Sequence, residues 1–135
     1  MTHAAINTQT LTIPAADGYP LAATRFAPAA SAASGAPASG ATIVLPCAMG
    51  VRQSFYYAFA HWLAEQGHVA ITFDYRGMGD SAPASLKGFA ASVTDWATKD
   101  YNAVLRWAKQ DGARPLFVVG HSLAGNCLGC CPTPA

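Results

Sequence analysis

One short segment carries residues whose types and spacing suit covalent chemistry. Residues 120–125 read Gly-His-Ser-Leu-Ala-Gly, which is close to the Gly-x-Ser-x-Gly pattern of a nucleophile elbow, with Ala124 at the last position of that pattern. In such a turn a serine lies between a strand and a helix, with its hydroxyl exposed for attack on a carbonyl carbon. Glycines at 120 and 125 suit a close approach of strand and helix. The pattern favours a nucleophilic role for Ser122. The alternative is that Ser122 only caps a helix.

Cysteine is the second reactive residue type, and its distribution is uneven. Cys47 stands alone, whereas Cys127, Cys130 and Cys131 cluster near the end of the sequence. A Cys-x-x-Cys-Cys segment can suggest metal or redox chemistry. A structural zinc site needs four ligands from two paired groups, and no second group is present. We therefore expect no metal and no cofactor. A metal-binding tail remains an alternative that elemental analysis for zinc would test.

The composition excludes several classes of protein. The 135 residues carry a formal net charge of +1, so there is no basic surface of the kind that binds nucleic acid or anionic membranes. No apolar run approaches the roughly 20 residues of a membrane-spanning helix. The first ten residues lack the pattern of a signal peptide. With 52% hydrophobic residues, the chain has enough for one domain with a buried core, and we expect a cytoplasmic protein.

The N-terminal part predicts a β-hairpin. Residues 8–14 alternate between apolar and polar types, as in a half-exposed strand, and residues 21–26 form a second short strand after the Asp17-Gly18 turn. Residues 27–40 consist almost wholly of Ala, Pro, Ser and Gly. This composition predicts a flexible connection.

From residue 41 onwards, strand and helix patterns alternate. The predicted strands are residues 42–45, 68–74 and 115–119, and the predicted helices are residues 54–66 and 91–110. The expected inward side chains are Phe55, Phe59, Trp62 and Leu63 on the first helix, and Val93, Trp96, Ala97, Val104, Leu105 and Trp107 on the second. Such alternation predicts a parallel sheet with crossover helices. Residues 46–53, 75–81 and 121–125 would then lie at the carboxyl edge of the sheet, where sites of this class gather.

The motifs and their order resemble those of the α/β-hydrolases. The opening hairpin comes first, followed by a strand that ends in Pro-Cys-Ala-Met-Gly at residues 46–50. Next come the turn Asp-Tyr-Arg-Gly-Met-Gly-Asp-Ser at 74–81 and the elbow. The turn is typical of lipase-like and serine-aminopeptidase-like members. The resemblance covers residues 8–125 and implies an α/β fold, of which this chain would form the N-terminal portion.

The resemblance also implies roles for individual residues. Ser122 would be the nucleophile, and the backbone N–H of Leu123 would be one oxyanion-hole donor. Ala48 and Met49 are both candidates for the second donor. The loop lacks the usual His-Gly pair, so the choice between them stays open. Two preorganised N–H groups can lower the activation free energy for formation of the oxyanion by several kcal/mol.

Other polar residues near these motifs suit structural roles. We interpret His121 as structural, because neighbouring residues on such a turn point in different directions. Asp74 and Arg76 would fix their loop, and His61 would lie on a helix surface. The acids Asp80, Asp95 and Asp100 all precede the elbow, whereas the acid and the base follow the nucleophile in this family.

The residues after the elbow do not supply a base. Residues 126–135 contain no His, Asp or Glu. Deletion of one G from a GGG codon run would convert a family-like Leu-Gly-Gly-Gln-Leu-Phe-Gly-Leu-Leu-Pro into the Leu-Ala-Gly-Asn-Cys-Leu-Gly-Cys-Cys-Pro found here. We therefore expect residues 1–125 to form a partial hydrolase domain and residues 126–135 to be a frameshifted tail. The downstream nucleotide sequence would test this.

These observations predict a serine hydrolase that acts on a small ester, or alternatively on an amide or peptide. Without the acid and the His base, we expect the chain as written to be inactive. Without the later strands of the family fold, the strand at residues 116–119 would form an exposed apolar edge, through which copies could associate. The alternative function is therefore a non-catalytic binding or dimerisation module built on the same sheet.

Overall fold

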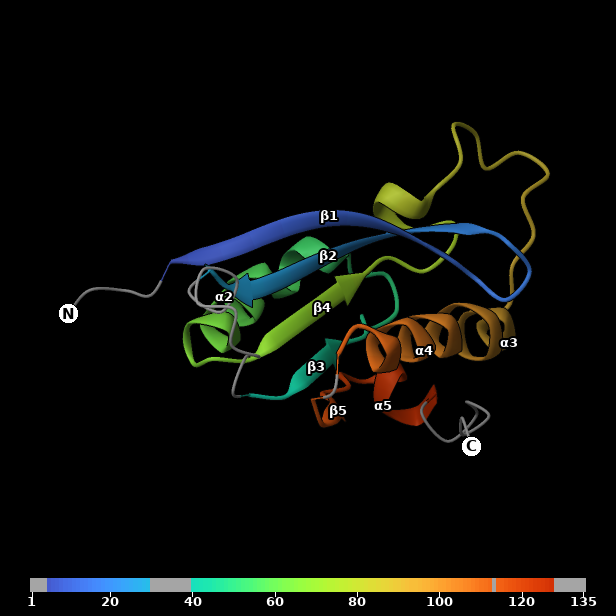
Figure 1. The fold of residues 1–135 in the computed structure, drawn as a ribbon. Coiled ribbons are helices and arrows are strands. Elements are labelled where there is room, and N and C mark those ends of the chain that lie inside the picture. The colour runs from blue at the N-terminus through green and yellow to red at the C-terminus, as the bar shows by residue number, and fades with distance from the viewer. Residues whose placement is uncertain (1–4, 30–39, 113, 128–135) are drawn as a thin grey trace.

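The computed structural model describes residues 5–29, 40–112 and 114–127. Its five-stranded sheet has the order β1-β2-β4-β3-β5 (Figure 1). The strands are β1 (Ile6–Pro14), β2 (Pro20–Pro28), β3 (Thr42–Leu45), β4 (Val69–Phe73) and β5 (Leu116–Val118). β2 pairs antiparallel with β1 and β4, and β3 pairs parallel with β4 and β5. This arrangement confirms the predicted α/β class, with an antiparallel hairpin followed by parallel strands.

The hairpin strands are longer than the sequence pattern predicts. β1 begins two residues earlier, at Ile6, and β2 continues to Pro28. β2 therefore includes the first two residues of the predicted connection at 27–40, and residues 30–39 of that connection lie outside the described residues. The added residues Ala27 and Pro28 pair with Asn7 and Ile6 of β1, so the longer β1 stabilises the extended backbone of β2 beyond its apolar stretch.

The parallel strands form the buried centre of the sheet. Every residue of β3 and of β4 is buried. Strands covered on both faces need apolar residues throughout, which explains why these two segments lack alternation in the sequence.

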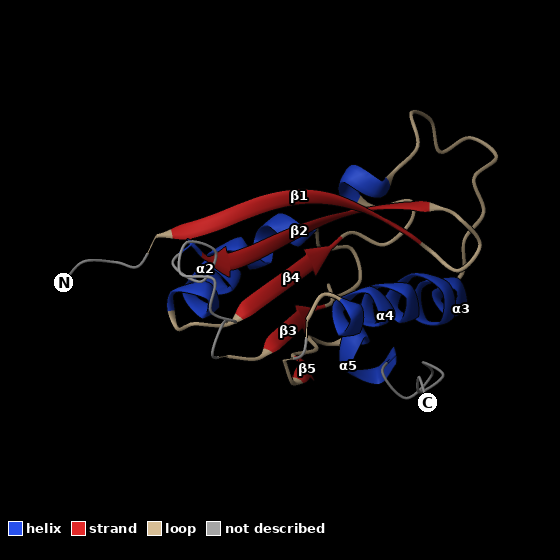
Figure 2. Cartoon of the chain, in the orientation of Figure 1, coloured by secondary structure: helices blue, strands red, loops and turns tan. Residues whose placement is uncertain are grey.

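Helices cover the two faces of the sheet (Figure 2). A 3₁₀ turn η1 (Gln53–Tyr56) leads into α2 (Tyr57–Glu65), which packs on one face. On the other face one helical stretch contains α3 (Val93–Asp95), the π-helical segment η3 (Trp96–Tyr101) and α4 (Asn102–Gln110). A further 3₁₀ turn, η2 (Gly79–Ser81), follows β4, and α5 (Leu123–Cys127) follows β5.

The prediction of the inward face of α2 was wrong for three of its four residues. Leu63 is buried, but Phe55, Phe59 and Trp62 are exposed. The side chains that α2 buries are Ala60, Leu63 and Ala64. Small alanines let the helix lie close to the sheet, and positions 60, 63 and 64 share one face at 3.6 residues per turn. The larger aromatic residues therefore fall on a different side of the helix.

The second helical stretch largely matches its prediction. Ala97, Val104 and Leu105 are buried, and Trp96 and Trp107 are half-buried against the same core. Val93 is exposed, contrary to prediction. It lies in the first turn, where Ser92 and Asp95 form a reciprocal capping box at 3.1 Å in both directions.

Candidate active site

Ser122 lies on the tight turn between β5 and α5, and its backbone is strained. Its φ is +56°, and it is the one non-glycine residue with positive φ in the described parts of the chain. A side-chain-bearing residue in this left-handed region costs of order 1–3 kcal/mol and persists only where the surrounding structure imposes it. The residue is exposed, and its carbonyl accepts from the N–H of Gly125 at 3.1 Å. The turn therefore presents Ser122 at the surface.

The two elbow glycines are not equivalent in the structure. A Cβ at Gly120 would lie 2.8 Å from the backbone N of Gly125 and 2.9 Å from its Cα. A Cβ at Gly125 would meet nothing closer than the Gly120 carbonyl oxygen, at 4.0 Å. The close approach predicted from the sequence is present, and it requires glycine at position 120 but not at 125.

The loop after β3 lies beside the elbow. β3 and β5 are parallel neighbours, so their carboxyl ends meet at one edge of the sheet (Figure 1). Ala48 is buried in this loop, and its N–H donates to the hydroxyl oxygen Oη of Tyr56 at 3.0 Å. Met49 follows with an exposed side chain, and Gly50 turns the chain with φ +76°. Both predicted loop donors, Ala48 and Met49, therefore lie at the same edge of the sheet as Ser122 and Leu123.

Tyr56 connects this loop to the elbow. Besides its bond from Ala48, Tyr56 Oη lies 2.9 Å from Nδ1 of His121, the residue before Ser122. Burial raises the pKa of the Tyr56 hydroxyl above its usual value. Sequence reasoning did not single out Tyr56. The available signal was a hydroxyl-bearing aromatic residue within reach of the loop, but only the fold shows that it also reaches His121.

The described histidines are all engaged away from the serine hydroxyl. His61 Nδ1 pairs with Glu65 at 3.0 Å on the surface of α2. His68 Nδ1 accepts from the N–H of Ala41 at 3.0 Å. His121 contacts Tyr56, which agrees with its predicted structural role. Within the described residues, no histidine is hydrogen-bonded to Ser122 as a base.

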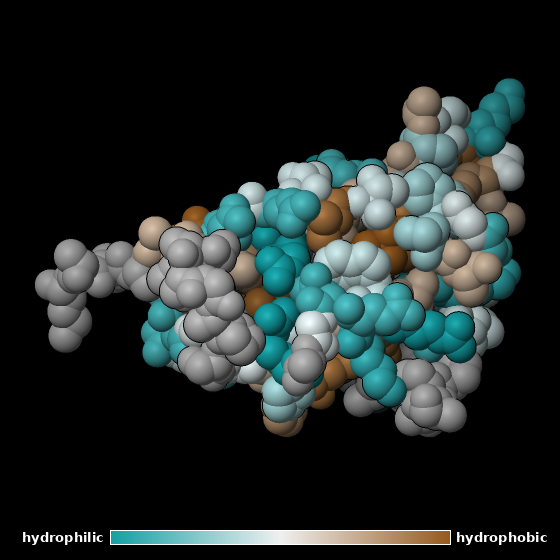
Figure 3. All heavy atoms as spheres, in the orientation of Figure 1, coloured by the Kyte–Doolittle hydropathy of each residue, from teal (hydrophilic) through white to brown (hydrophobic). Residues whose placement is uncertain are grey.

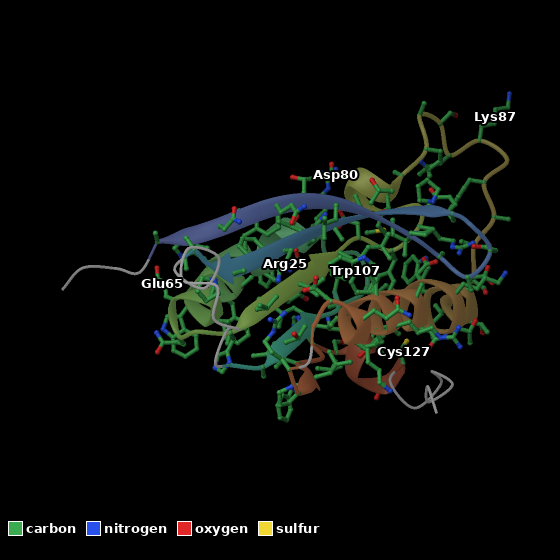
Figure 4. The ribbon with its side chains drawn as sticks, viewed as in Figure 1. Arg25, Glu65, Asp80, Lys87, Trp107 and Cys127 are labelled. Atoms are coloured by element: carbon green, nitrogen blue, oxygen red, sulfur yellow. The ribbon has the colours of Figure 1, made fainter. Side chains whose placement is uncertain are left out.

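The turn after β4 is held by a buried polar network. Asp74 accepts from Gln53 N at 2.8 Å, from Gln53 Nε2 at 3.1 Å and from Asp80 N at 3.1 Å. Asp80 itself lies on the exposed side of this turn (Figure 4). Gln53 also accepts from Thr72 at 2.8 Å and from Thr24 at 3.1 Å. Asp74 therefore fixes the loop, as its sequence position predicted.

Arg76 is the centre of a second polar cluster. Its guanidinium donates to both Asp17 oxygens at 2.7 and 2.8 Å and, through Nε and Nη2, to Asp100 Oδ1 at 2.9 and 2.7 Å. The bond to Arg76 holds the pKa of Asp17 well below its usual range, whereas burial raises that of Asp100. Both acids therefore form ion pairs with Arg76. These contacts give Arg76 a structural role, as predicted.

Cys47 is a buried and unreactive thiol. Its Sγ lies 3.1 Å from the carbonyl oxygen of Phe73. Burial, with a smaller contribution from Asp74, raises its pKa to about 12. Cys130 and Cys131 lie outside the described residues. Among the described residues, no three His, Cys, Asp or Glu side chains gather as a metal site.

A groove away from the elbow lies between β1 and α4. It has a volume of about 240 Å³ and is lined by residues that include Ile13, Asn102 and Trp107. Trp107 projects from α4 on the side of the sheet opposite α2 (Figure 4). None of the residues that line this groove belongs to the elbow or the loop after β3, so it is separate from the candidate site.

Solved structures share the fold of this chain. An esterase from Exiguobacterium antarcticum is 23% identical with a TM-score of 0.62, and the match covers 88% of this chain and 38% of that one. A carboxyl esterase from Bacillus coagulans is 17% identical with a TM-score of 0.67, covering 89% and 38%. For a hypothetical protein from Pseudomonas aeruginosa the identity is 20% and the TM-score 0.68, with 89% and 37% covered. The chain thus spans under half the length of these proteins.

Comparison by sequence gives a family match but no curated relative. No curated protein is significantly similar to the chain. In the parts of the chain that the structure describes, no helix is long and apolar enough to cross a membrane. The family model for serine aminopeptidase, S33, matches residues 38–128, which include both the loop after β3 and the elbow. With its α/β sheet and its Gly-His-Ser-Leu-Ala-Gly turn, the chain belongs to this serine aminopeptidase family of α/β-hydrolases.

Proposed function

We propose that the chain supplies the nucleophile and the oxyanion hole of a serine hydrolase that acts on esters, with amides or peptides as alternative substrates. The observation that carries this proposal is the left-handed backbone of Ser122, at φ +56° on an exposed strand-to-helix turn. A serine that only capped a helix would have extended backbone and would need no such strain. The strain fits a hydroxyl that must project from the turn towards a substrate.

The oxyanion hole is proposed to use backbone donors from two segments. Leu123 N–H at the start of α5 is one, and the loop after β3 provides the other. The N–H of Ala48 is already bonded to Tyr56 Oη. We therefore favour Met49 over Ala48 as the loop donor. Met49 also lies on the exposed part of the loop, where a substrate oxygen can approach.

The chemical step follows from these roles. Ser122 Oγ attacks the carbonyl carbon, the carbonyl oxygen becomes an oxyanion held by the two N–H groups, and the alcohol leaves to give an acyl-enzyme that water hydrolyses. The serine proton must be removed, and residues 126–135 contain no His, Asp or Glu. We infer that full turnover needs a base and an acid from outside this sequence. Alone, the chain would retain the weaker catalysis of the oxyanion hole and binding.

Acylation of Ser122 by p-nitrophenyl acetate tests the nucleophile separately from turnover. The 135-residue chain and Ser122→Ala would be incubated with the ester between pH 6 and 10, and the acetylated residue located by peptide mass spectrometry. We expect acetylation at Ser122 that rises in proportion to hydroxide, with negligible turnover, because no neighbouring base is available. Equal acetylation of Ser122→Ala at other sites, with none at Ser122 in the unmutated chain, would contradict the proposed nucleophile.

The same experiment tests the missing base. A rate that levels off near neutral pH, with turnover approaching that of an intact esterase, would show that the chain does contain a base. Tyr56→Phe is a useful companion variant, because it removes the hydroxyl that contacts His121 and Ala48 while leaving Ser122 in place. If the Ser122 reaction depended on His121 as base, freeing its ring in this way would change the pH profile.

A further inference from the structure

The groove between β1 and α4 contains a buried polar atom that the fold leaves without a partner. Asn102 begins α4, is only 4% exposed and lines this groove. Its side-chain oxygen Oδ1 is buried and accepts no hydrogen bond from any described residue. Nearly all buried polar groups in folded proteins are paired, because an unpaired one is costly. A hydrogen-bond donor from outside the chain would remove this cost.

The walls of the groove suit a small molecule with one ring. Ile13 and Pro14 line it from β1, and Ala103 and Trp107 line it from α4. Trp107 is half-buried (Figure 4), and hydrophobic residues reach the surface between the hairpin and α4 in the middle of Figure 3. The volume of about 240 Å³ lies below the roughly 300–1,000 Å³ of pockets for drug-sized ligands. The groove therefore has room for a single aromatic ring packed against Trp107.

Arg106 brings a positive charge to the same groove. It lines the groove four residues after Asn102, so the two side chains share one face of α4. Arg106 is exposed and forms no ion pair with another described residue. On the hairpin side, Asp17 follows the lining residue Ala16, but its carboxylate is bound to Arg76. The Arg106 guanidinium is therefore available to a carboxylate from outside the chain.

The position of the groove separates it from the elbow. β1 is an edge strand, and β2, β4 and β3 lie between it and β5 at the other edge. The two walls, β1 and α4, contact each other directly. A further strand of the family fold that paired with β5 would lie at the far edge of the sheet from the groove. The lining of the groove therefore comes from described elements on the β1 side.

We propose that the groove between β1 and α4 binds a small aromatic carboxylate that carries a hydroxyl or N–H group. The ring would lie against Trp107, the carboxylate would pair with Arg106, and the hydroxyl or N–H would donate to Asn102 Oδ1. Asn102 and Arg106 are about one helical turn apart, so a donor and a carboxylate at opposite ends of one ring can reach both. This site is distinct from Ser122 and does not depend on the proposed hydrolase activity.

Titration of the full 135-residue chain with 4-hydroxyphenylacetate tests the site. NMR resonances of the Trp107 indole N–H and the Asn102 side-chain amide should shift. The expected dissociation constant is about 0.1–1 mM, because a single-ring ligand has few contacting atoms. Ser122→Ala should bind equally, since the groove lies away from the elbow. Loss of binding in Ser122→Ala, or unshifted Trp107 and Asn102 resonances up to about 10 mM, would overturn the proposal.

Two variants and two altered ligands test the polar contacts separately. Phenylacetate lacks the hydroxyl and should bind the unmutated chain about tenfold more weakly, whereas Asn102→Leu should bind both ligands alike. 4-Hydroxyphenylacetamide lacks the charge and should also bind about tenfold more weakly, a difference that Arg106→Gln should abolish. Lys109→Gln is the matched control, because Lys109 is an exposed cation of α4 that does not line the groove.

Thermal unfolding separates a ligand site from a purely structural asparagine. If Oδ1 has no partner in the fold, Asn102→Leu should leave Tm unchanged or raise it, because it removes an unpaired polar group. A bound water molecule alone on Asn102 would leave the titration flat and overturn the proposal. Equal weakening by Arg106→Gln and Lys109→Gln would also overturn it. Circular dichroism checks each fold, and Arg106→Gln, at an exposed position, keeps the test decisive if Asn102→Leu does not fold.

Discussion

At the residue scale, Ser122 depends on a few neighbours with defined geometry. Gly120 has no side chain because the backbone of Gly125 occupies the space. Tyr56 links the loop that carries Ala48 to His121, the residue next to Ser122. The pattern of glycines and serine was readable in the sequence, whereas the tyrosine contact needed the fold.

Gly120→Ala and Gly125→Ala should behave differently. The first places a methyl group 2.8 Å from a backbone nitrogen and should lower the free energy of unfolding by about 1–3 kcal/mol. The second adds a methyl group with ordinary contacts inside a helix and should be neutral or stabilising by up to about 1 kcal/mol. Urea denaturation of both variants measures the difference. Equal effects would mean that the close approach is absent.

Tyr56→Phe should loosen the loop after β3. The N–H of Ala48 would lose its acceptor, and a buried donor without a partner costs about 1–3 kcal/mol. Amide hydrogen exchange at Ala48 should therefore become faster, and the imidazole resonances of His121 should shift. Tyr57→Phe serves as the control, because its hydroxyl lies 3.3 Å from Thr24 Oγ1 and contacts neither residue. Unchanged exchange at Ala48 would argue against the bridge.

Cys47 should make stability depend on alkaline pH. Its pKa is raised from the ordinary thiol value of 9.0 to about 12 in the folded chain, so the folded state holds the thiol proton more tightly than the unfolded state. This contribution is complete below pH 9 and is lost as pH rises towards 12. The unmutated chain should lose more stability than Cys47→Ala over that interval in urea titrations. Parallel pH curves would show that burial does not perturb the thiol.

At the scale of elements, polar side chains determine how strands and turns are joined. Gln53 is buried and connects η1 to the Thr24 hydroxyl on β2, the Thr72 hydroxyl on β4 and the carboxylate of Asp74. The sequence places Gln53 in a polar loop and gives no sign of burial. On β2, Arg25 pairs with Asp111 at the end of α4 at 2.7 Å (Figure 4). Such contacts depend on tertiary neighbours.

Gln53→Leu should be strongly destabilising although the two side chains have similar size. Both threonine hydroxyls and the Asp74 carboxylate would lose partners in a buried setting, at a combined cost of roughly 2–4 kcal/mol. Gln110→Leu, at an exposed position of α4, should stay within about 0.5 kcal/mol. Thermal unfolding of the two variants checks this. A tolerated Gln53→Leu would mean that the network does not form.

At the scale of the whole molecule, Arg76 joins three distant segments. It binds Asp17 in the hairpin turn and Asp100 in η3, while it lies itself on the turn after β4. Asp100 is fully buried and Asp17 is partly exposed. Removal of one member of a buried ion pair leaves the other charge poorly compensated. The loss of unfolding free energy when one of these acids is replaced therefore tests whether the three segments are assembled around Arg76.

Asp100→Asn should cost about 3 kcal/mol of unfolding free energy, because Arg76 would keep only its partly exposed partner. His61→Ala removes a surface contact with Glu65 and should cost no more than about 1 kcal/mol. Chemical denaturation monitored by tryptophan fluorescence compares the two. Similar small losses in both variants would mean that the Arg76 cluster contributes little to the fold.

The sequence alone determined the α/β class, the order of its elements, the elbow and the structural roles of Asp74, Arg76 and His121. These features rest on local spacing, turn chemistry and runs of apolar residues, all of which can be read along the chain. The tertiary structure decided the rest. Alanines, not aromatics, are the residues by which α2 packs on the sheet, and Gln53 and Tyr56 act through partners distant in sequence. Burial depends on what lies opposite a residue, which only the assembled fold determines.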